Sequence, residues 1–383
     1  MMPADRTKTV TISDVARAAG VSTATVSLVV NGQASSLRIS EATRQTVMEA
    51  VSRLGYTPNH AARSLRSRRT GTLALVVTQV DIPHHGELAT AAVAAAESYG
   101  FDLHILEARS PEHECRLLGR LRGGQVDGVL AATTRSVYDQ EGRQVHAELI
   151  QRQAARAALA QSGVPVVVLF DRSPDPHVPA VRIDDAEGAY LATQHLIQQG
   201  HRRIADICLR TEPPHPDDVS VSADRFRGYR RALHNAGLPF APELLVPSEH
   251  GPRLAAGQAI GARWHSLGPT GVTAAFVAND LISIGLLRGL YDADIQVPDD
   301  LAVAAFGGIE MARYTRPSLT TVDHPRAEIG RIGTEMLVGL IEGRPAPELE
   351  RILPVTLTVR ESSMPSCQRA RLPEAPDGRT APR

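Results

Sequence analysis

Four small side chains near the start of the chain have the types and the spacing to recognise another molecule. Thr23 and Ala24 are followed one helical turn later by Ser27 and Leu28, so the four share a face if the segment is helical. Hydroxyl groups donate and accept hydrogen bonds. The methyl groups of Thr, Ala and Leu can contact a thymine methyl on a DNA base edge, and none of the four can bind guanine in a bidentate manner. The chemistry they support is recognition.

The charged and nucleophilic residues elsewhere form no sequence motif of an enzyme. The 383 residues contain no phosphate-binding GxxxxGK[ST] loop, no GxSxG nucleophile motif and no HExxH zinc motif. The cysteines Cys115, Cys208 and Cys367 lie far apart and include no CxxC pair, which is typical of a protein in a reducing compartment. We therefore expect no enzyme activity, no cofactor and no metal site.

The composition indicates a globular protein with a basic N-terminal end. The chain length of 383 residues is enough for two or three domains. Hydrophobic residues make up 43% of the chain, so a sizeable core can form. The net charge is −1, yet residues 1–70 hold about ten Lys and Arg against four Asp and Glu. A basic end joined to an acidic body favours nucleic-acid binding. With no export signal and no apolar run of about 18 residues, we expect a cytoplasmic protein without membrane contact.

The four candidate residues lie in a segment, residues 11–32, that predicts two short helices joined by a tight turn. Thr11 can cap the first helix, and Gly20 can end it because Gly tolerates the left-handed conformation. Ser22 can cap the second helix, which Asn31-Gly32 stops. The geometry suits a helix-turn-helix, whose second helix presents its early residues to the DNA major groove. An ordinary helical hairpin in a core is the alternative.

The rest of the chain predicts a third helix and then a larger α/β body. Ser40 can cap a helix that Gly55 closes, so three short helices form a headpiece. From residue 72, apolar runs alternate with amphipathic helices, the pattern of parallel sheets flanked by helices. The number of runs favours two lobes with a cleft between them. The runs are 73–77, 103–106, 128–132, 165–170, 204–208, 274–278 and 301–306, with a final strand at roughly 353–359.

The headpiece, the segment PNHAARSLRSRRTGTLALVV and the two-lobed body together resemble the LacI/GalR family of bacterial transcription regulators. Later segments, such as VPVVVLFDR (164–172), SADRFRGYRRAL (222–233) and VPDDLAVAAFGG (297–308), follow the family pattern in order and spacing. The resemblance covers residues 10 to about 360. It implies a small all-α helix-turn-helix headpiece with a hinge helix, followed by a two-lobed α/β periplasmic-binding-protein-like domain of parallel sheets flanked by helices.

The resemblance implies the following division of the chain. The headpiece takes residues 1–57, the hinge helix and linker 58–71, the effector-binding and dimerisation domain 72–360, and a disordered tail 361–383. Within the large domain, the N-lobe takes about 72–183 and 324–350, and the C-lobe about 184–323 and 351–360. Residues 328–342 have helical apolar spacing that suits either the core or a dimer interface.

The resemblance also implies which residues touch DNA. Thr11, Ser22, Thr25, Ser40 and Arg44 are placed for backbone phosphates, which position a protein without reading sequence. Leu65 aligns with a leucine that wedges into the minor groove and bends the DNA. The other DNA-binding residues are those of the second helix and the hinge: Thr23, Ala24, Ser27, Leu28, Asn31, Asn59, Ala62, Arg63 and Arg66. The alternatives are that Leu28 packs on the headpiece and that the hinge is a solvated basic linker.

Four positions match the family's ligand-contacting motifs, namely Asp171, Arg225, Asn279 and Asp280; Asp280 could instead cap a helix. Where the family often has aromatic or acidic residues, this chain has His84-His85, Pro252 and Gly307-Gly308. We expect the cleft to lack an acidic acceptor and aromatic stacking surface. Our hypothesis is a polar, anionic ligand bound by Arg225 with His84 and His85. A metal held by the histidine pair and a plain loop role for it are the alternatives.

Together these features predict a transcriptional regulator, a repressor, that binds a roughly palindromic double-stranded DNA operator as a homodimer. Its effector would be a small polar ligand, a sugar or an acidic metabolite, bound between the lobes. The alternatives are a regulator without a small-molecule effector and a ligand-binding module with a weak DNA headpiece.

Overall fold

The computed structural model describes residues 10–30, 39–56, 69–133, 146–173, 175, 178–208, 212–216, 218, 220–248 and 253–365. The chain forms two compact units, Met1–Thr70 and Gly71–Arg383. Six of the predicted DNA-binding residues lie outside the described residues: Asn31, Asn59, Ala62, Arg63, Leu65 and Arg66.

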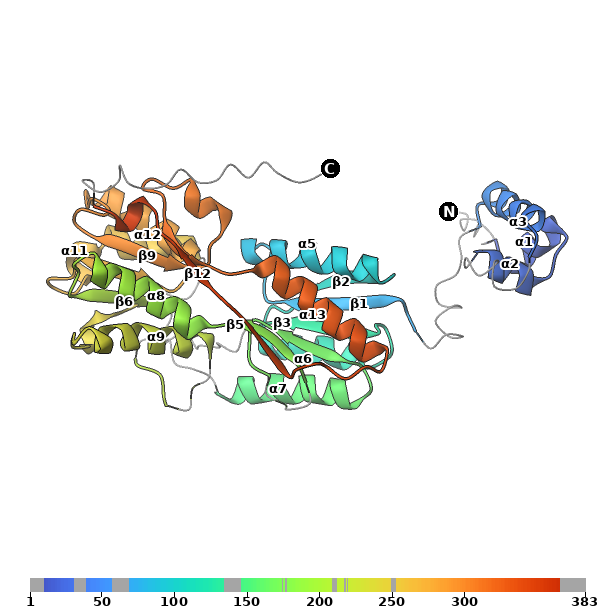
Figure 1. Ribbon diagram of the computed structural model, residues 1–383, viewed down its shortest axis with the longest axis horizontal. Coiled ribbons are helices and arrows are strands. Elements are labelled where there is room, and N and C mark those ends of the chain that lie inside the picture. Colours follow the sequence, from blue (N-terminus) through green and yellow to red (C-terminus); the bar gives the residue numbers. More distant parts are fainter. Residues whose placement is uncertain are drawn as a thin grey trace, which may run out of the picture. The chain divides into compact units, whose positions relative to one another are not determined.

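The described residues of the first unit form three short helices around a small apolar core (Figure 1). They are α1 (Ile12–Ala19), α2 (Thr23–Val30) and α3 (Glu41–Leu54). The caps are those predicted: Thr11 precedes α1, Gly20 ends it with a left-handed φ of 68°, and Ser40 accepts a hydrogen bond from the Thr43 backbone. The core residues are Val15, Ala16, Val26, Val29, Val47 and Ala50.

The second unit begins with the N-lobe, a six-stranded parallel sheet in the order β11-β5-β4-β3-β1-β2. Alternate residues of β1 pack on opposite faces: Leu73 and Leu75 face a core that includes Leu88, whereas Ala74 and Val76 face Leu118. Helices α5 and α13 cover one face, and α6 and α7 cover the other (Figure 1). The elements are β1 (Thr72–Val77), α5 (Pro83–Ser98), β2 (Asp102–Glu107), α6 (Pro111–Leu121), β3 (Gly128–Ala132), α7 (His146–Gln161), β4 (Val166–Leu169), β5 (Ala180–Ile183), α13 (Arg326–Ile341) and β11 (Glu350–Leu353).

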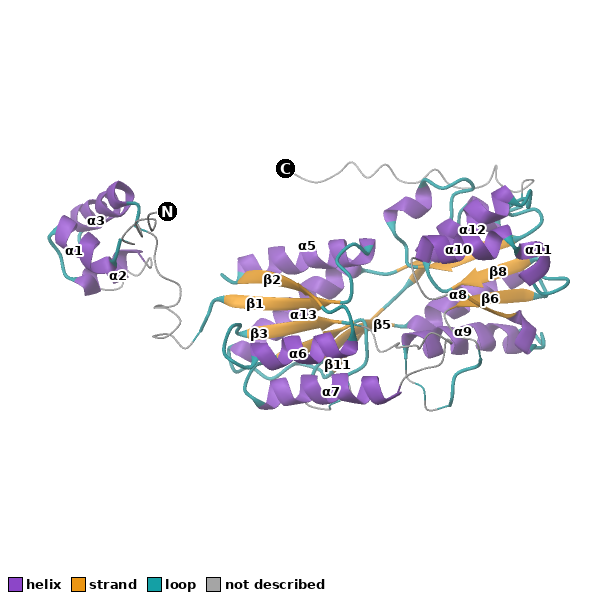
Figure 2. Cartoon of the chain, turned by 180° about the vertical axis from the view of Figure 1, so that it is seen from behind, coloured by secondary structure: helices purple, strands orange, loops and turns teal. Residues whose placement is uncertain are grey.

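The C-lobe is a second six-stranded sheet in the order β12-β10-β9-β8-β6-β7, parallel except for the β10–β12 pair. Helices α8 and α9 lie on one face, and α10 and α12 on the other (Figure 2). The elements are α8 (Asp185–Gln198), β6 (Ile204–Cys208), α9 (Val221–Asn235), η2 (Pro242–Leu244), β7 (Leu245–Pro247), α10 (Arg253–Ala262), α11 (Trp264–Leu267), β8 (Ala274–Val277), α12 (Asp280–Asp292), β9 (Ala302–Phe306), η3 (Glu310–Arg313), β10 (Thr320–Asp323), β12 (Thr356–Thr358) and η4 (Glu361–Ser363).

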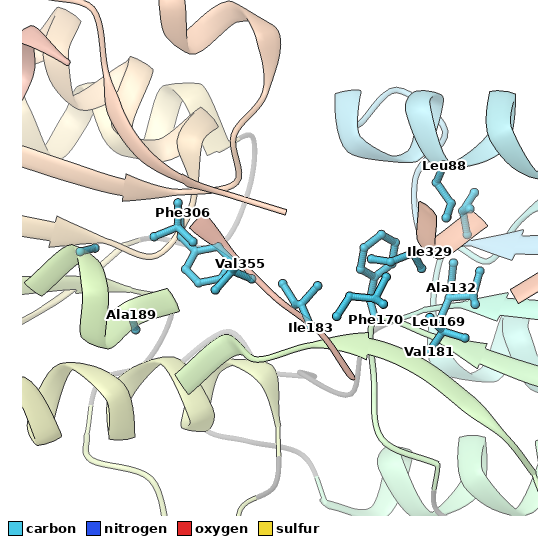
Figure 3. Packing of buried hydrophobic residues seen from close by; sticks show 14 of the residues in the cluster. Leu88, Ala132, Leu169, Phe170, Val181, Ile183, Ala189, Phe306, Ile329 and Val355 are labelled. Atoms are coloured by element: carbon cyan, nitrogen blue, oxygen red, sulfur yellow. The ribbon is translucent and has the colours of Figure 1, made fainter. Parts of the chain in front are cut away.

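One apolar core continues from lobe to lobe. Phe170 and Ile183 of the N-lobe belong to the same cluster of buried residues as Phe306 of the C-lobe and Val355 on the connection between β11 and β12 (Figure 3). The predicted single strand at 353–359 is therefore wrong. It is replaced by two short strands, β11 in the first sheet and β12 in the second, so the chain crosses between the lobes after residue 353 rather than after 350.

The C-terminal boundary also differs from the expectation. The expected disordered tail begins at residue 361. In the structure, Glu361–Ser363 form η4, and Ser362 and Ser363 are fully buried. Ser362 donates a hydrogen bond to the Val303 carbonyl at 2.7 Å, and the Ser363 hydroxyl lies 2.7 Å from His195 Nε2. Small polar residues can close a lobe when each hydroxyl has a buried partner, a pairing that polarity along the sequence does not reveal.

Candidate functional site

The first candidate site is the exposed side of α2. Thr23 and Ala24 are exposed, whereas Val26 and Val29 point into the headpiece core. The Ser22 hydroxyl accepts a hydrogen bond from the Thr25 backbone at 3.1 Å and lies 2.9 Å from the Thr25 hydroxyl, so these two side chains fix the start of α2. The first turn of α2 therefore presents short side chains to solvent.

Leu28 is not part of the headpiece core. Packing on the headpiece was the alternative to a contact of Leu28 with DNA. The apolar residues that pack against the headpiece core, within the described part of the chain, include Ile12, Val21 and Val30 but not Leu28. Leu28 is half-buried. An apolar side chain outside the core is available for contact with another molecule.

Two of the predicted phosphate-binding residues, Thr11 and Arg44, already contact carboxylates. The Thr11 hydroxyl donates to the Asp14 carboxylate at 2.7 Å, and this bond is the main reason that the pKa of Asp14 is lowered. Arg44 forms an exposed ion pair with Glu41, with 2.9 Å between Nε and Oε1. A phosphate would therefore compete with Glu41 for the Arg44 guanidinium.

The second candidate site is a cavity of about 140 Å³ between the two lobes. His84, Phe170 and Ile183 line it from the N-lobe, and His324 lies at the end of β10 beside α13. The C-lobe contributes the beginnings of four helices together with the end of β9: Asp185, Val221, Ser222, Arg225, Arg253, Ala278, Asn279, Ile282, Phe306 and Gly307. In open α/β sheets, ligands bind beyond the carboxyl ends of the strands, where helices begin.

Arg225 lines this cavity, the place that its sequence motif predicts. Its Nε donates to Asp185 at 2.8 Å, its Nη1 donates to the Ala278 carbonyl at 2.5 Å, and its guanidinium carbon lies 3.8 Å from the centre of the Phe306 ring. A planar guanidinium stacked on a ring and held by a carboxylate is well oriented for a ligand. Burial raises the pKa of Asp185 to about 6, although the charge of Arg225 acts in the opposite direction.

The histidine pair is divided between two roles. His84 lines the cavity, and its ring packs at 5.9 Å from the ring of Phe170. His85 is buried and does not line the cavity; its Nδ1 donates to the Gln79 carbonyl at 2.5 Å. Successive residues of a helix point about 100° apart, so α5 directs His84, and not His85, to the cavity. Contact of His85 with an effector stays a prediction.

Asp171 and Asp280 are also outside the cavity lining. Phe170 adopts a left-handed φ of 62°, and its ring, not the carboxylate of Asp171, faces the cavity. Asp280 is buried and accepts hydrogen bonds from the Thr321 hydroxyl at 2.5 Å and from the Ile309 backbone at 2.8 Å. Its carboxylate joins α12 to β10. The effector contacts of both residues stay predictions, which this cavity lining does not support.

Asn279 combines a structural role with a place in the cavity. Its Oδ1 accepts a hydrogen bond from the Leu281 backbone at 2.9 Å and caps α12. The helix-capping role that was the alternative for Asp280 therefore belongs to Asn279. Its amide nitrogen remains as a donor, because the side-chain oxygen is the atom that caps the helix.

The Gly307-Gly308 pair is required by its surroundings. Gly308 has a φ of 66°, and a Cβ there would lie 2.3 Å from an Asp323 oxygen; at Gly307 a Cβ would lie 2.7 Å from an Asp280 oxygen. Both glycine carbonyls accept hydrogen bonds from Arg326. An acidic side chain at either position would clash with the carboxylate of Asp280 or Asp323 and be repelled by its charge.

The sequence interpretation missed much of the cavity. Arg253, Asp185, Phe170, Phe306 and His324 line it without having been singled out as ligand contacts. The expected loss of aromatic surface is also wrong, since the rings of Phe170 and His324 lie 5.7 Å apart and those of Phe306 and His324 lie 6.3 Å apart. An aromatic residue that ends an apolar strand was the available signal for Phe170 and Phe306.

Burial keeps the cavity histidines uncharged. It lowers the pKa of His84 to about 2, with a further contribution from the neighbouring His85, and it lowers the pKa of His324 well below its usual range. Neutral imidazole presents one donor and one acceptor nitrogen. In the described parts of the chain, no three His, Cys, Asp or Glu side chains lie close enough together to hold a metal ion, and no helix is long and apolar enough to span a membrane.

Comparison with known proteins places both sites in context. Residues 11–59 match the family model described as bacterial regulatory proteins, lacI family, and residues 193–363 match that of a periplasmic binding protein-like domain. The transcriptional regulator CelR of Thermobifida fusca is 35% identical over 94% of this chain and 99% of its own length.

Two solved structures share the fold. A CelR–cellobiose complex is 33% identical, with a TM-score of 0.64 over 92% of this chain and 99% of that one. A lac repressor dimer bound to operator and the anti-inducer ONPF is 24% identical, with a TM-score of 0.76 over 93% of this chain and 100% of that one. These matches confirm the predicted fold class, a helix-turn-helix followed by a two-lobed α/β domain.

Proposed function

Since the chain belongs to the LacI family of bacterial regulatory proteins, which are transcriptional regulators and not enzymes, we propose that it is a repressor that binds a palindromic operator as a homodimer. A small polar ligand in the inter-lobe cavity controls the binding. The observation that carries the proposal is the composition of α2: two valines in the core and, at its start, exposed Thr23 and Ala24.

The mode of DNA recognition follows from these side chains. The first turn of a recognition helix contacts base edges in the major groove. Thr23 supplies one hydroxyl and one methyl group, and Ala24 and Leu28 supply methyl groups, which suit thymine. Ser27 adds a second hydroxyl. Base reading by such contacts is modest in energy, so phosphate contacts and the basic segment around Arg63 and Arg66 supply much of the affinity.

The homodimer and the ligand are supported by relatives. The lac repressor of the matching structure is a dimer bound to operator, and CelR was solved with cellobiose. Two-fold symmetry of a dimer predicts two half-sites about one helical turn of DNA apart. The site of ligand control is the cavity around Arg225, where residues of both lobes meet.

Selection of DNA from a random double-stranded pool by the full-length protein tests this function. We expect an enriched, roughly palindromic sequence whose binding weakens steeply as the salt concentration rises. A footprint on that sequence should cover both half-sites. Recovery of no enriched sequence would contradict the proposal and favour a ligand-binding protein with a weak headpiece.

A further inference from the structure

The hydrogen-bonding groups of the cavity are unbalanced in favour of donors. The guanidinium groups of Arg225 and Arg253 and the amide of Asn279 supply N–H groups. Among the described residues, Asp185 is the one lining carboxylate, and it already accepts from Arg225. A sugar hydroxyl needs acceptors as well as donors, but a carboxylate or phosphate group only accepts. Such a cavity is matched to an acceptor-rich ligand.

We propose that the effector is a small anion, and that Arg253 is the residue that binds its acidic group. This inference rests on the proposed function, in which the cavity is the effector site. It adds a residue that was not recognised in the sequence, and it defines the chemical class of the ligand.

Arg253 carries a charge that has no close partner among the residues that the structure describes. It is half-buried and lines the cavity at the first residue of α10. Its guanidinium makes no hydrogen bond or ion pair with any residue that the structure describes, whereas Arg225 is held by Asp185. Burial and the charge of Arg225 lower the pKa of Arg253. A bound anion would stabilise the charged guanidinium of Arg253 and so offset both the desolvation and the repulsion from Arg225.

The charges that face Arg253 leave the cavity positive. Within the described part of the lining, Arg225 of α9 is the second cation and Asp185 of α8 is the single carboxylate. His84 of α5 and His324 beside α13 are neutral because of burial. Asp81, which attracts Arg253 electrostatically, is exposed and outside the lining. Two guanidinium groups against one carboxylate give a net positive site.

The side chain of His324 is a second, independent observation that indicates a ligand site. Its side chain is about nine-tenths buried and lines the cavity, yet its Nδ1 has no hydrogen-bond partner among the described residues. Buried polar atoms in native structures are nearly always paired, so an atom in this position is explained by a ligand. Neutral Nδ1–H can donate to an anionic oxygen.

The packing of α10 on α12 brings these groups together. A Cβ at Gly257 would lie 2.0 Å from the Ile282 carbonyl oxygen, and a Cβ at Gly285 would lie 2.0 Å from that of Leu254. Arg253 begins α10 and Asn279 caps α12, and both residues line the cavity. The N-termini of both helices add partial positive charge, which stabilises an anion further.

The test uses inorganic phosphate and a matched set of three probes, namely glucose, glucuronate and glucose 6-phosphate. Thermal unfolding of the full-length protein is measured at constant ionic strength, with chloride as the reference, and affinities are measured by titration calorimetry. We expect at least one anionic probe to raise the unfolding midpoint above that in chloride, and glucose to have no effect. The Arg253→Gln variant should bind that anion at least tenfold more weakly, the loss of a charge-assisted hydrogen bond.

The control is Arg313→Gln, which removes an exposed arginine outside the cavity and should respond as the wild type does. Stabilisation by glucuronate alone identifies a carboxylate ligand, and stabilisation by the two phosphates identifies a phosphate. No stabilisation by any anion, or equal stabilisation of Arg253→Gln and wild type, would overturn the inference. Operator binding by the wild type is measured separately, so failure of the proposed function is distinguishable.

Discussion

At the residue scale, the ion pair between Arg225 and Asp185 determines how the cavity presents its charge. The pair is 2.8 Å long and largely buried. Its carboxylate fixes the Arg225 fork and leaves Arg253 as the cation without such a partner. A buried pair of this kind contributes little net stability, because desolvation of the two charges offsets their attraction. Its value lies in orienting Arg225.

The raised pKa of Asp185 predicts a specific pH dependence of stability. The pKa is about 6 in the folded protein, against 3.8 for the free carboxyl group. The contribution of Asp185 to folding is therefore fully present below about pH 4 and is lost as the pH rises through 6. Relative to the wild type, Asp185→Asn should gain up to about 3 kcal/mol in unfolding free energy between pH 4 and 7.

Chemical denaturation across this pH range provides the measurement. Asp184→Asn is the matched control, because it changes the neighbouring carboxylate at the N-cap of α8, where Asn also caps well. A stability difference between Asp185→Asn and wild type that does not change with pH would show that the Asp185 pKa is not raised.

At the element scale, helix crossings at glycine place the cavity residues. Gly257 and Gly285 allow α10 and α12 to pack backbone against backbone, and the first turns of both helices reach the cavity. Any side chain at the crossing would push the helices apart and displace the first turns that line the cavity.

We expect Gly257→Ala to destabilise the protein by about 1–3 kcal/mol or more, because the added methyl meets backbone rather than a flexible side chain. Gly119→Ala in α6 is the control: it is exposed, and nothing lies within 4 Å of a Cβ there, so Ala should stabilise the helix by about 0.5–1 kcal/mol. Urea unfolding of both variants decides. Equal effects would mean that the crossing is not close-packed.

The elements were predictable from sequence to the extent that their signals are local. The three headpiece helices follow from caps at Thr11, Ser22 and Ser40, and the central strands follow from apolar runs. The short strands β5, β7 and β10 were missed, because runs of three or four residues, such as Leu245–Pro247, carry little periodicity. The crossing from β11 to β12 depends on pairing with distant strands, which no local pattern specifies.

The site was predictable only in part, for the same reason. His84, Arg225 and Asn279 line the cavity as expected. His85, Asp171 and Asp280 lie in or next to the expected elements but outside the cavity lining. His85 points about 100° away from His84 on α5 and bonds the Gln79 carbonyl. Asp171 follows Phe170, which has a left-handed backbone, and Asp280 bonds Thr321 in the buried interior. Arg253 was missed because its importance comes from its place in the cavity lining without a close partner among the described residues, a property of the folded lobe.

At the scale of the whole molecule, the chain combines a helix-turn-helix unit with a two-lobed unit similar to periplasmic binding proteins. The cavity lies where residues of both lobes meet, with one apolar core running through Phe170, Ile183 and Phe306 (Figure 3). A ligand there can change the arrangement of the lobes only if it binds one arrangement more tightly than another. The hinge around Leu65, outside the described residues, is the segment that we expect to transmit that difference to DNA.

The central claim, that α2 reads the operator through small side chains under control of the cavity, is tested most directly by repeating the selection of random DNA with variants of α2. Thr23→Ala and Leu28→Ala alter the exposed side, whereas Thr46→Ala alters an exposed residue of α3 whose hydroxyl bonds its own helix at 2.9 Å. We predict that wild type and Thr46→Ala enrich the same palindrome, and that each α2 variant changes the bases of both half-sites symmetrically, with about 1–3 kcal/mol lost per altered contact. Identical half-site sequences for all four proteins would contradict the account.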